Sequence, residues 1–153
     1  MRTPANIAKH PIHPMLVPIP IGLWIFSLIC DLISLAGYPG AWSTVALYTM
    51  VGGIVGALVA AIPGLIDLLS LPAGPRGTAL AHMTINLTVV ALYVVNSWLR
   101  WADPSNMRGA PLWLSLIGVG LLAVSGWLGG KMVYVHGIAV DAVPDTTTTP
   151  GRR

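Results

Sequence analysis

The stretch Trp42–Leu69 reads WSTVALYTMVGGIVGALVAAIPGLIDLL, and Asp67 is the only charged residue in it. A helix needs about 20 consecutive apolar residues to cross the hydrocarbon core of a lipid bilayer. The run is longer than that and therefore predicts a transmembrane helix over residues 42–69. Three runs of the same kind, at about 15–36, 78–99 and 111–133, predict three more helices.

The composition of the whole chain supports this interpretation. Hydrophobic residues make up 55% of the 153 residues and charged residues only 8%, whereas about a quarter of the residues in a soluble domain are charged. We predict an all-α fold, a four-helix transmembrane bundle over residues 15–140 with both termini on the same side. A His-Pro segment (1–14) precedes the bundle. A polar tail (141–153) follows it, and we expect this tail to be disordered.

Basic residues are distributed unevenly between the two ends of the predicted bundle. The end without the termini carries Arg100 and Arg108, and the end with the termini carries Arg2, Lys9, Arg76, Lys131, Arg152 and Arg153. Because cytoplasmic segments carry the excess of Lys and Arg, we expect the termini to be cytoplasmic. The net charge of +3 does not indicate nucleic-acid binding, since the basic residues are scattered singly and form no stripe.

Two of the predicted helices carry faces of small residues. Gly52, Gly56 and Ala60 recur every four residues in the second helix, a spacing that favours close contact between membrane helices. The fourth helix has a similar face, formed by Ser115, Gly118, Leu122, Ser125 and Gly129. We expect both faces to pack against neighbouring helices.

The third helix carries a mostly polar stripe. Its members alternate at spacings of three and four, which places them on one helix face, and they are His82, Asn86, Val89, Tyr93 and Asn96. Polar residues in a membrane helix normally face the bundle interior, so we expect this stripe to point inward. His13 precedes Trp24 by the same interval that His82 precedes Tyr93, which hints at a duplicated helical hairpin.

The histidines are predicted to gather at one end of the bundle. His10 and His13 stand before the first helix, His82 opens the third helix and His136 follows the fourth. Asp67 and Lys131 are expected at the same end. The charged residues of the opposite end are expected to be spread out; they are Asp31, Arg100, Asp103 and Arg108.

Histidine is the usual side chain for binding a metal or a haem iron through a neutral imidazole. A haem b needs two imidazoles from different segments, and we prefer His82 and His136 as axial ligands, with His13 next. His10 and Asn86 are further candidates for the cofactor site, and Lys131 or Arg76 could meet the propionates. Alternatively, a Zn, Fe or Cu ion could be held by imidazoles together with a carboxylate, the candidates being His10, His13, His82, His136 and Asp67.

The same residues also have structural interpretations. His10 and His13 could anchor the chain at the headgroup level, and His82 could cap its helix. Asp67 and Lys131 could pair with each other. The sequence contains no nucleophile–base pair, phosphate loop or paired acidic dyad, and it leaves open whether the chain is an enzyme.

Several motifs bring a resemblance to a family into view. The opening His10-Pro11-Ile12-His13-Pro14, the segment Ile62-Pro63-Gly64-Leu65-Ile66-Asp67, and Gly126–Gly130 followed by Tyr134 and His136 resemble a bacterial membrane family labelled domain of unknown function 2231. The resemblance covers about residues 10–140. It implies a four-helix domain in the bacterial inner membrane. Relatives of this type resemble domains joined to redox modules such as Rieske iron-sulfur or dehydrogenase domains, which favours electron transfer.

Three hypotheses about function follow. The leading one is a redox-type module that binds haem b, or a metal ion, through the histidines and exchanges electrons with a redox protein or a quinone. The second is a structural or assembly subunit without enzymatic activity, which the small-residue faces favour. The third is a small transporter that uses the polar stripe and, with only four helices, would need to form oligomers.

Overall fold

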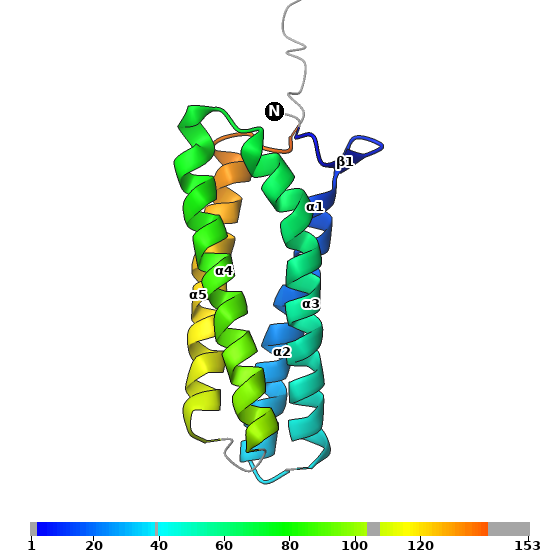
Figure 1. The fold of residues 1–153 in the computed structure, drawn as a ribbon, viewed down its shortest axis with the longest axis vertical. Helices are drawn as coiled ribbons and strands as arrows, with labels where there is room; N and C mark the ends of the chain where they lie inside the picture. Colours follow the sequence, from blue (N-terminus) through cyan, green and yellow to red (C-terminus); the bar gives the residue numbers. More distant parts are fainter. Residues whose placement is uncertain (1–2, 39, 104–107, 141–153) are drawn as a thin grey trace, which may run out of the picture.

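The computed structural model describes residues 3–38, 40–103 and 108–140, and these form a bundle of long helices (Figure 1). The long helices are α2 (Pro18–Leu35), α3 (Ala41–Leu69), α4 (Ala73–Ala102) and α5 (Ala110–Tyr134), and the short α1 (Ile12–Leu16) leads into α2. Four spans, the first counted over Ile12–Leu35, are long and apolar enough to cross a membrane. The predicted all-α bundle is confirmed, although α4 is longer at both ends than the expected 78–99.

Prolines account for the interruption between α1 and α2. Pro18 and Pro20 have no N–H group, so the carbonyls of Pro14 and Leu16 lack their usual helical donors. Val17 nevertheless keeps helical dihedral angles and donates its N–H to the carbonyl of His13. The two helices therefore form one slightly broken span, which begins at Ile12 and not at the expected Met15.

A small β-hairpin precedes the first span. Strands β1 (Asn6–Ile7) and β2 (His10–Pro11) are antiparallel, and the turn residues Ala8 and Lys9 both have positive φ angles, 49° and 70°. Ala5 donates its N–H to Oδ1 of Asp67, 2.9 Å away at the end of α3. This bond ties the N-terminal segment to the end of the bundle where α3 ends.

The chain forms two helical hairpins that pack against each other. We call α1, α2 and α3 the first hairpin, and α4 with α5 the second hairpin. In Figure 1 the β-hairpin and the end of α5 lie at the same, upper end of the bundle, so the two ends of the described chain are on the same side, as predicted. Between the hairpins, α3 contacts α4 and α2 contacts α5.

The two hairpins repeat the same contacts. Nδ1 of His13 bonds to the Ala60 carbonyl, and Nδ1 of His82 bonds to the Ser125 carbonyl. The donors lie 69 positions apart, the separation that also joins Asp31 to Arg100, and the acceptors lie 65 positions apart. The internal duplication hinted at by the sequence is therefore visible as matched interactions.

Further pairs keep the same two separations. Ser27 donates to the Ala46 carbonyl at 2.7 Å, and Asn96 donates to the Pro111 carbonyl at 2.9 Å. The ring of Trp24 lies over Gly53, and the ring of Tyr93 lies over Gly118. Side chains on α1, α2 and α4 thus meet acceptors and glycines at matching positions of α3 and α5. In α3 the glycine beneath Trp24 is Gly53, whereas Gly52 and Gly56 of the predicted small-residue face contact other side chains of α2.

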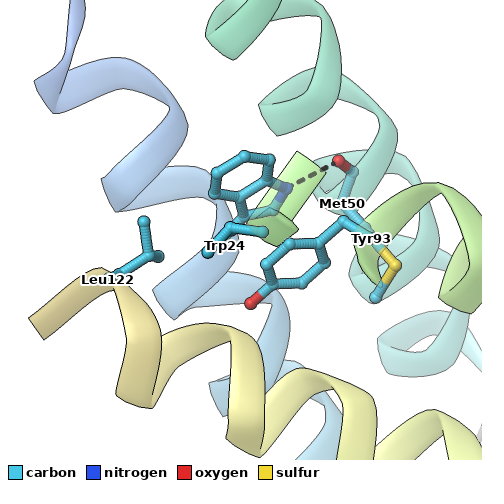
Figure 2. Close-up of a cluster of buried hydrophobic side chains, with 5 residues drawn as sticks. Trp24, Met50, Tyr93 and Leu122 are labelled. Carbon is cyan, nitrogen blue, oxygen red and sulfur yellow. Dashed lines mark hydrogen bonds between the residues drawn. The ribbon is translucent and has the colours of Figure 1, made fainter. Parts of the chain in front are cut away.

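The core is centred on two stacked aromatic rings. Trp24 and Tyr93 are 4.4 Å apart between ring centroids and nearly parallel, with 5° between their planes. Met50 and Leu122 flank them, so all four helices contribute to the cluster (Figure 2). Many Ile, Leu and Val side chains remain exposed on the outer faces, as expected for helices that face lipid rather than water.

Candidate functional site

Side chains from the first hairpin and from α4 meet in three layers along the bundle. We call His13 and His82 the histidine layer, Trp24 and Tyr93 the aromatic layer, and Asp31 and Arg100 the charged layer. Successive layers are about 16 Å and 10 Å apart along the helices, given a rise of about 1.5 Å per residue. The aromatic layer forms part of the hydrophobic core, so the two polar layers are the candidate sites for a ligand.

The histidine layer brings together two imidazoles from different spans. The ring centroids of His13 and His82 are 6.4 Å apart, and the ring planes are nearly perpendicular at 88°. Nδ1 of His13 is 2.8 Å from the Ala60 carbonyl on α3. Nδ1 of His82 is 3.0 Å from the Ser125 carbonyl on α5. Each ring is therefore held by the other helix of its own hairpin.

Each imidazole rests on a glycine one helical turn beyond its acceptor. A Cβ atom at Gly64 would lie 2.8 Å from Nδ1 of His13, which is too close for a side chain. A Cβ atom at Gly129 would lie 3.6 Å from Cε1 of His82, an ordinary contact distance. Gly64 is thus required for the position of the His13 ring, whereas Gly129 leaves some room beside His82.

The backbone acceptor of His13 fixes the tautomer of that ring. A carbonyl oxygen can only accept a hydrogen bond, so Nδ1 of His13 carries a hydrogen. Nδ1 of His82 is 3.0 Å from the Ser125 carbonyl and also 3.0 Å from Ser125 Oγ, and it carries a hydrogen in the tautomer that donates to the carbonyl. In the neutral imidazole the other nitrogen, Nε2, then has a free lone pair. This arrangement is typical of histidines that bind a metal, because the outer hydrogen bond fixes the ring and raises its basicity. The pair can therefore act as two ligands or as two bases.

Asn86 supports the histidine layer through its amide nitrogen. Its Nδ2 donates to Oγ of Ser125 at 2.7 Å and to the carbonyl of His82 at 2.8 Å. Ser125 Oγ is in turn 3.0 Å from Nδ1 of His82. Asn86 thus helps to hold Ser125 against the His82 ring.

The other two histidines lie outside the long helices. His10 is exposed in the β-hairpin and bonds through Nδ1 to the Ala8 carbonyl at 2.9 Å. His136 lies in the turn beyond the end of α5. Its Nε2 is buried without a hydrogen-bond partner among the described residues.

The end of α5 next to His136 is marked by Gly137. Gly137 has a φ of 60°, and its N–H bonds to the Val133 carbonyl while the Ile138 N–H bonds to the Met132 carbonyl. The first of these is the bond of an αL-type helix end. The regular helix ends at Tyr134, so His136 lies in the turn that follows it.

Asp67 and Lys131 have roles away from the histidine pair. Asp67 accepts the hydrogen bond from Ala5 described above, and Lys131 is exposed in the last turn of α5. Within residues 3–38, 40–103 and 108–140, no group of three or more His, Cys, Asp or Glu side chains is arranged to hold a metal ion. Among the sequence candidates, the structure brings His13 and His82 together, with Asn86 behind them.

The charged layer at the opposite end was not expected from the sequence. Nη1 and Nη2 of Arg100 donate to the two carboxylate oxygens of Asp31 at 2.5 and 2.6 Å. Asp31 is 1% exposed and Arg100 3% exposed, so the ion pair is buried. The expectation that the charges of this end are spread out is therefore wrong for these two residues.

Two polar side chains complete the charged layer. Asn96 accepts from Nε of Arg100 at 2.8 Å and donates to Oγ of Ser115 at 2.9 Å. Ser115 in turn contacts Asp31 Oδ2 at 3.4 Å. The repeat gave a signal for this layer, because Asp31 and Arg100 each lie seven residues beyond Trp24 and Tyr93.

Comparison with known proteins gives a family. The family model described as "Predicted membrane protein (DUF2231)" matches residues 9–142, which is nearly the whole chain. No curated protein and no solved structure matches the chain.

Proposed function

This chain belongs to the DUF2231 family of predicted membrane proteins, and we propose that it is a redox-type membrane module that binds a b-type haem between His13 and His82. The observation that carries the proposal is that Nδ1 of each ring lies against a main-chain carbonyl, at 2.8 Å for His13 and 3.0 Å for His82, an arrangement that leaves Nε2 to serve as a ligand. The preferred axial pair thus changes from His82 and His136 to His13 and His82.

The separation of the rings supports ligation of one metal centre. Two imidazoles bound in line to one ion have centroids about 6 Å apart, since a metal–nitrogen bond is about 2.0–2.1 Å and the ring adds about 1 Å on each side. The rings of His13 and His82 are 6.4 Å apart. His13 and His82 would hold the group from two different spans.

The haem would supply a one-electron couple, and the chain's residues would set its surroundings. Bis-imidazole ligation and burial both influence the potential of a haem iron. Gly64 and the carbonyls of Ala60 and Ser125 would hold the two rings in fixed orientation. A reduced redox protein or a quinol would donate the electron at the membrane surface, and an oxidised partner would take it up.

The excess of basic residues supports a cytoplasmic location of the histidine end, which the two ends of the described chain share. Arg100 is neutralised in the charged layer, so Arg108 is the remaining basic residue at the other end. This increases the asymmetry that determines orientation by the positive-inside rule. We therefore propose insertion in a bacterial inner membrane with cytoplasmic termini.

The polar stripe of α4 offers little support for a transporter. Asn86 and Asn96 are used in hydrogen bonds to α5, and Trp24 and Tyr93 stack across the middle of the bundle. Interhelical bonding instead favours the assembly subunit as the second candidate. In that case the histidines serve only to join helices within each hairpin.

The test is an absorption spectrum of the detergent-purified protein after expression with ample haem. We expect a Soret band that is lost in H13A and in H82A and retained in the matched control H10A and in H136A. Elemental analysis of the same samples separates haem iron from a bound Zn, Fe or Cu ion. A wild-type preparation without a Soret band and without bound metal would leave the assembly subunit as the function.

A further inference from the structure

The charged layer differs from the other two layers in one respect. In the histidine and aromatic layers, equivalent positions of the two hairpins hold like residues, His13 with His82 and Trp24 with Tyr93. In the charged layer, 69 positions separate an acid, Asp31, from a base, Arg100. The repeat is therefore broken by charge at this one level of the three.

The opposite charges of Asp31 and Arg100 bear on which hairpins can pack against each other. Because equivalent residues meet in the middle of the bundle, two copies of the first hairpin packed in this way would bring Asp31 against another Asp31. Two copies of the second hairpin would bring Arg100 against another Arg100. Burying two like charges together in the membrane is costly, whereas the unlike hairpins neutralise each other.

We propose that Asp31 and Arg100 make each hairpin select the unlike hairpin as its partner and reject a second copy of itself. The surface concerned consists of the inner faces of α2 and α4, near the C-terminal ends of these two helices. Its partner is a helical hairpin of the same design that carries the opposite charge. This inference is independent of the haem proposal.

Two polar side chains of the second hairpin orient Arg100 toward the first hairpin. Asn96 holds Nε of Arg100 at 2.8 Å and Ser115 lies 3.3 Å from its Nη2, so α4 and α5 orient the guanidinium between them. The planar group then offers two parallel N–H bonds to a carboxylate, a geometry that adds specificity as well as energy. Asp31 accepts both bonds and also lies 3.4 Å from Ser115 Oγ.

The residues that select the partner need not be the ones that stabilise the fold. Replacing a buried ion pair by apolar residues of similar volume is often neutral for stability, while leaving one charge unpaired is damaging. If the ion pair selects the partner, correct pairing of the hairpins depends on opposite charges at positions 31 and 100 more than on the presence of charge there. Buried polar groups are known to fix the register and partner of helical assemblies in this way.

Five full-length chains test the proposal: wild type, D31R, R100D, the exchange D31R/R100D and the apolar D31L/R100M. Each is purified from membranes in detergent, and its yield, its melting temperature and its mass by light scattering are measured. We expect D31R and R100D to lose most of the monodisperse protein, and D31R/R100D to recover at least half of the wild-type yield. D31L/R100M should melt within a few degrees of wild type but contain several-fold more oligomer.

Three results would overturn the proposal. The first is a D31R/R100D chain no better than the single variants, because the signs would then not be what the hairpins recognise. The second is a D31L/R100M chain as unstable as the single variants, because the ion pair would then be an ordinary stabilising contact. A D31L/R100M chain as free of oligomer as wild type would also count against it.

Discussion

The histidine layer and the charged layer each join two residues that lie 69 positions apart, but their side chains interact in different ways. Both join one residue of the first span to one residue of α4 across the bundle. In the charged layer each charged side chain is directed at the other, and Asn96 and Ser115 complete the hydrogen bonding. In the histidine layer both Nδ1 contacts go outward to α3 and α5, and neither Nε2 atom has a hydrogen-bond partner among the described residues.

The difference separates a layer whose polar groups pair with each other from a layer whose imidazoles are open to a ligand. Polar groups in the membrane interior are expensive unless they are paired or functional. The charged layer meets this requirement by internal pairing. The histidine layer meets it only in part, which is why we place the proposed function there and not in the ion pair.

The largest expected effect is the loss of one partner in the charged layer. Arg100→Met leaves the carboxylate of Asp31 buried without its cation, which costs about 3–5 kcal/mol. His82→Ala leaves no buried charge, and losing its hydrogen bond costs about 1 kcal/mol. Unfolding of the two variants in detergent, by heat or by added SDS, measures the difference. Equal destabilisation by R100M and H82A would show that the two layers do not differ in this way.

A smaller effect is expected from the two glycines beside the imidazoles. Gly64→Ala would place a methyl group 2.8 Å from Nδ1 of His13, and such overpacking costs about 1–3 kcal/mol. The ring must also shift, so haem binding should fall. Gly129→Ala is the matched control, because its methyl would lie 3.6 Å from His82, and it gains up to about 1 kcal/mol of helix propensity. Melting temperatures and Soret absorbance of both variants measure these effects. A G64A chain with the melting temperature and Soret absorbance of wild type would contradict the close packing of the His13 ring against Gly64.

The smallest effect is expected in the aromatic layer between the two. Trp24 donates Nε1–H to the Met50 carbonyl at 3.1 Å, whereas the buried hydroxyl of Tyr93 has no hydrogen-bond partner among the described residues. Tyr93→Phe should therefore be neutral or stabilise by about 1 kcal/mol, because an unpaired buried polar group costs about 1–3 kcal/mol. Trp24→Phe should lose about 1 kcal/mol with its hydrogen bond. Melting temperatures compare the stabilities of the two variants. A Y93F chain less stable than W24F would contradict the conclusion that the hydrogen bond of Trp24 contributes more than the hydroxyl of Tyr93.

The architecture was largely predictable from the sequence. Hydropathy alone predicted α3 as 42–69, against Ala41–Leu69 in the structure, because a long apolar run has few alternatives to a membrane helix. The spacing of His82, Asn86, Val89, Tyr93 and Asn96 correctly predicted an inward face. The equal intervals His13–Trp24 and His82–Tyr93 pointed to the duplication that the contacts display.

Part of the candidate site was beyond the reach of the sequence. Periodicity gives the face of a residue but not which helices oppose each other, so Asp31 and Arg100 were expected to be spread out. The orientation of His136 could not be derived from periodicity, because regular helix ends at Tyr134 and the chain turns at Gly137, which has a positive φ angle. Asp67 was weighed as a partner of Lys131, yet it accepts from the main chain of Ala5, a contact with no side-chain signature.

The most direct test of the central claim is an electron paramagnetic resonance spectrum of the oxidised, haem-loaded protein. Two axial imidazoles give a six-coordinate, low-spin ferric haem, so we predict a low-spin signal for wild type and for H10A. H13A and H82A, each with one ligand left, should give a high-spin signal or lose the haem. A low-spin signal that persists in either H13A or H82A, or a wild-type protein that takes up no haem, would contradict the assignment of His13 and His82 as the ligand pair.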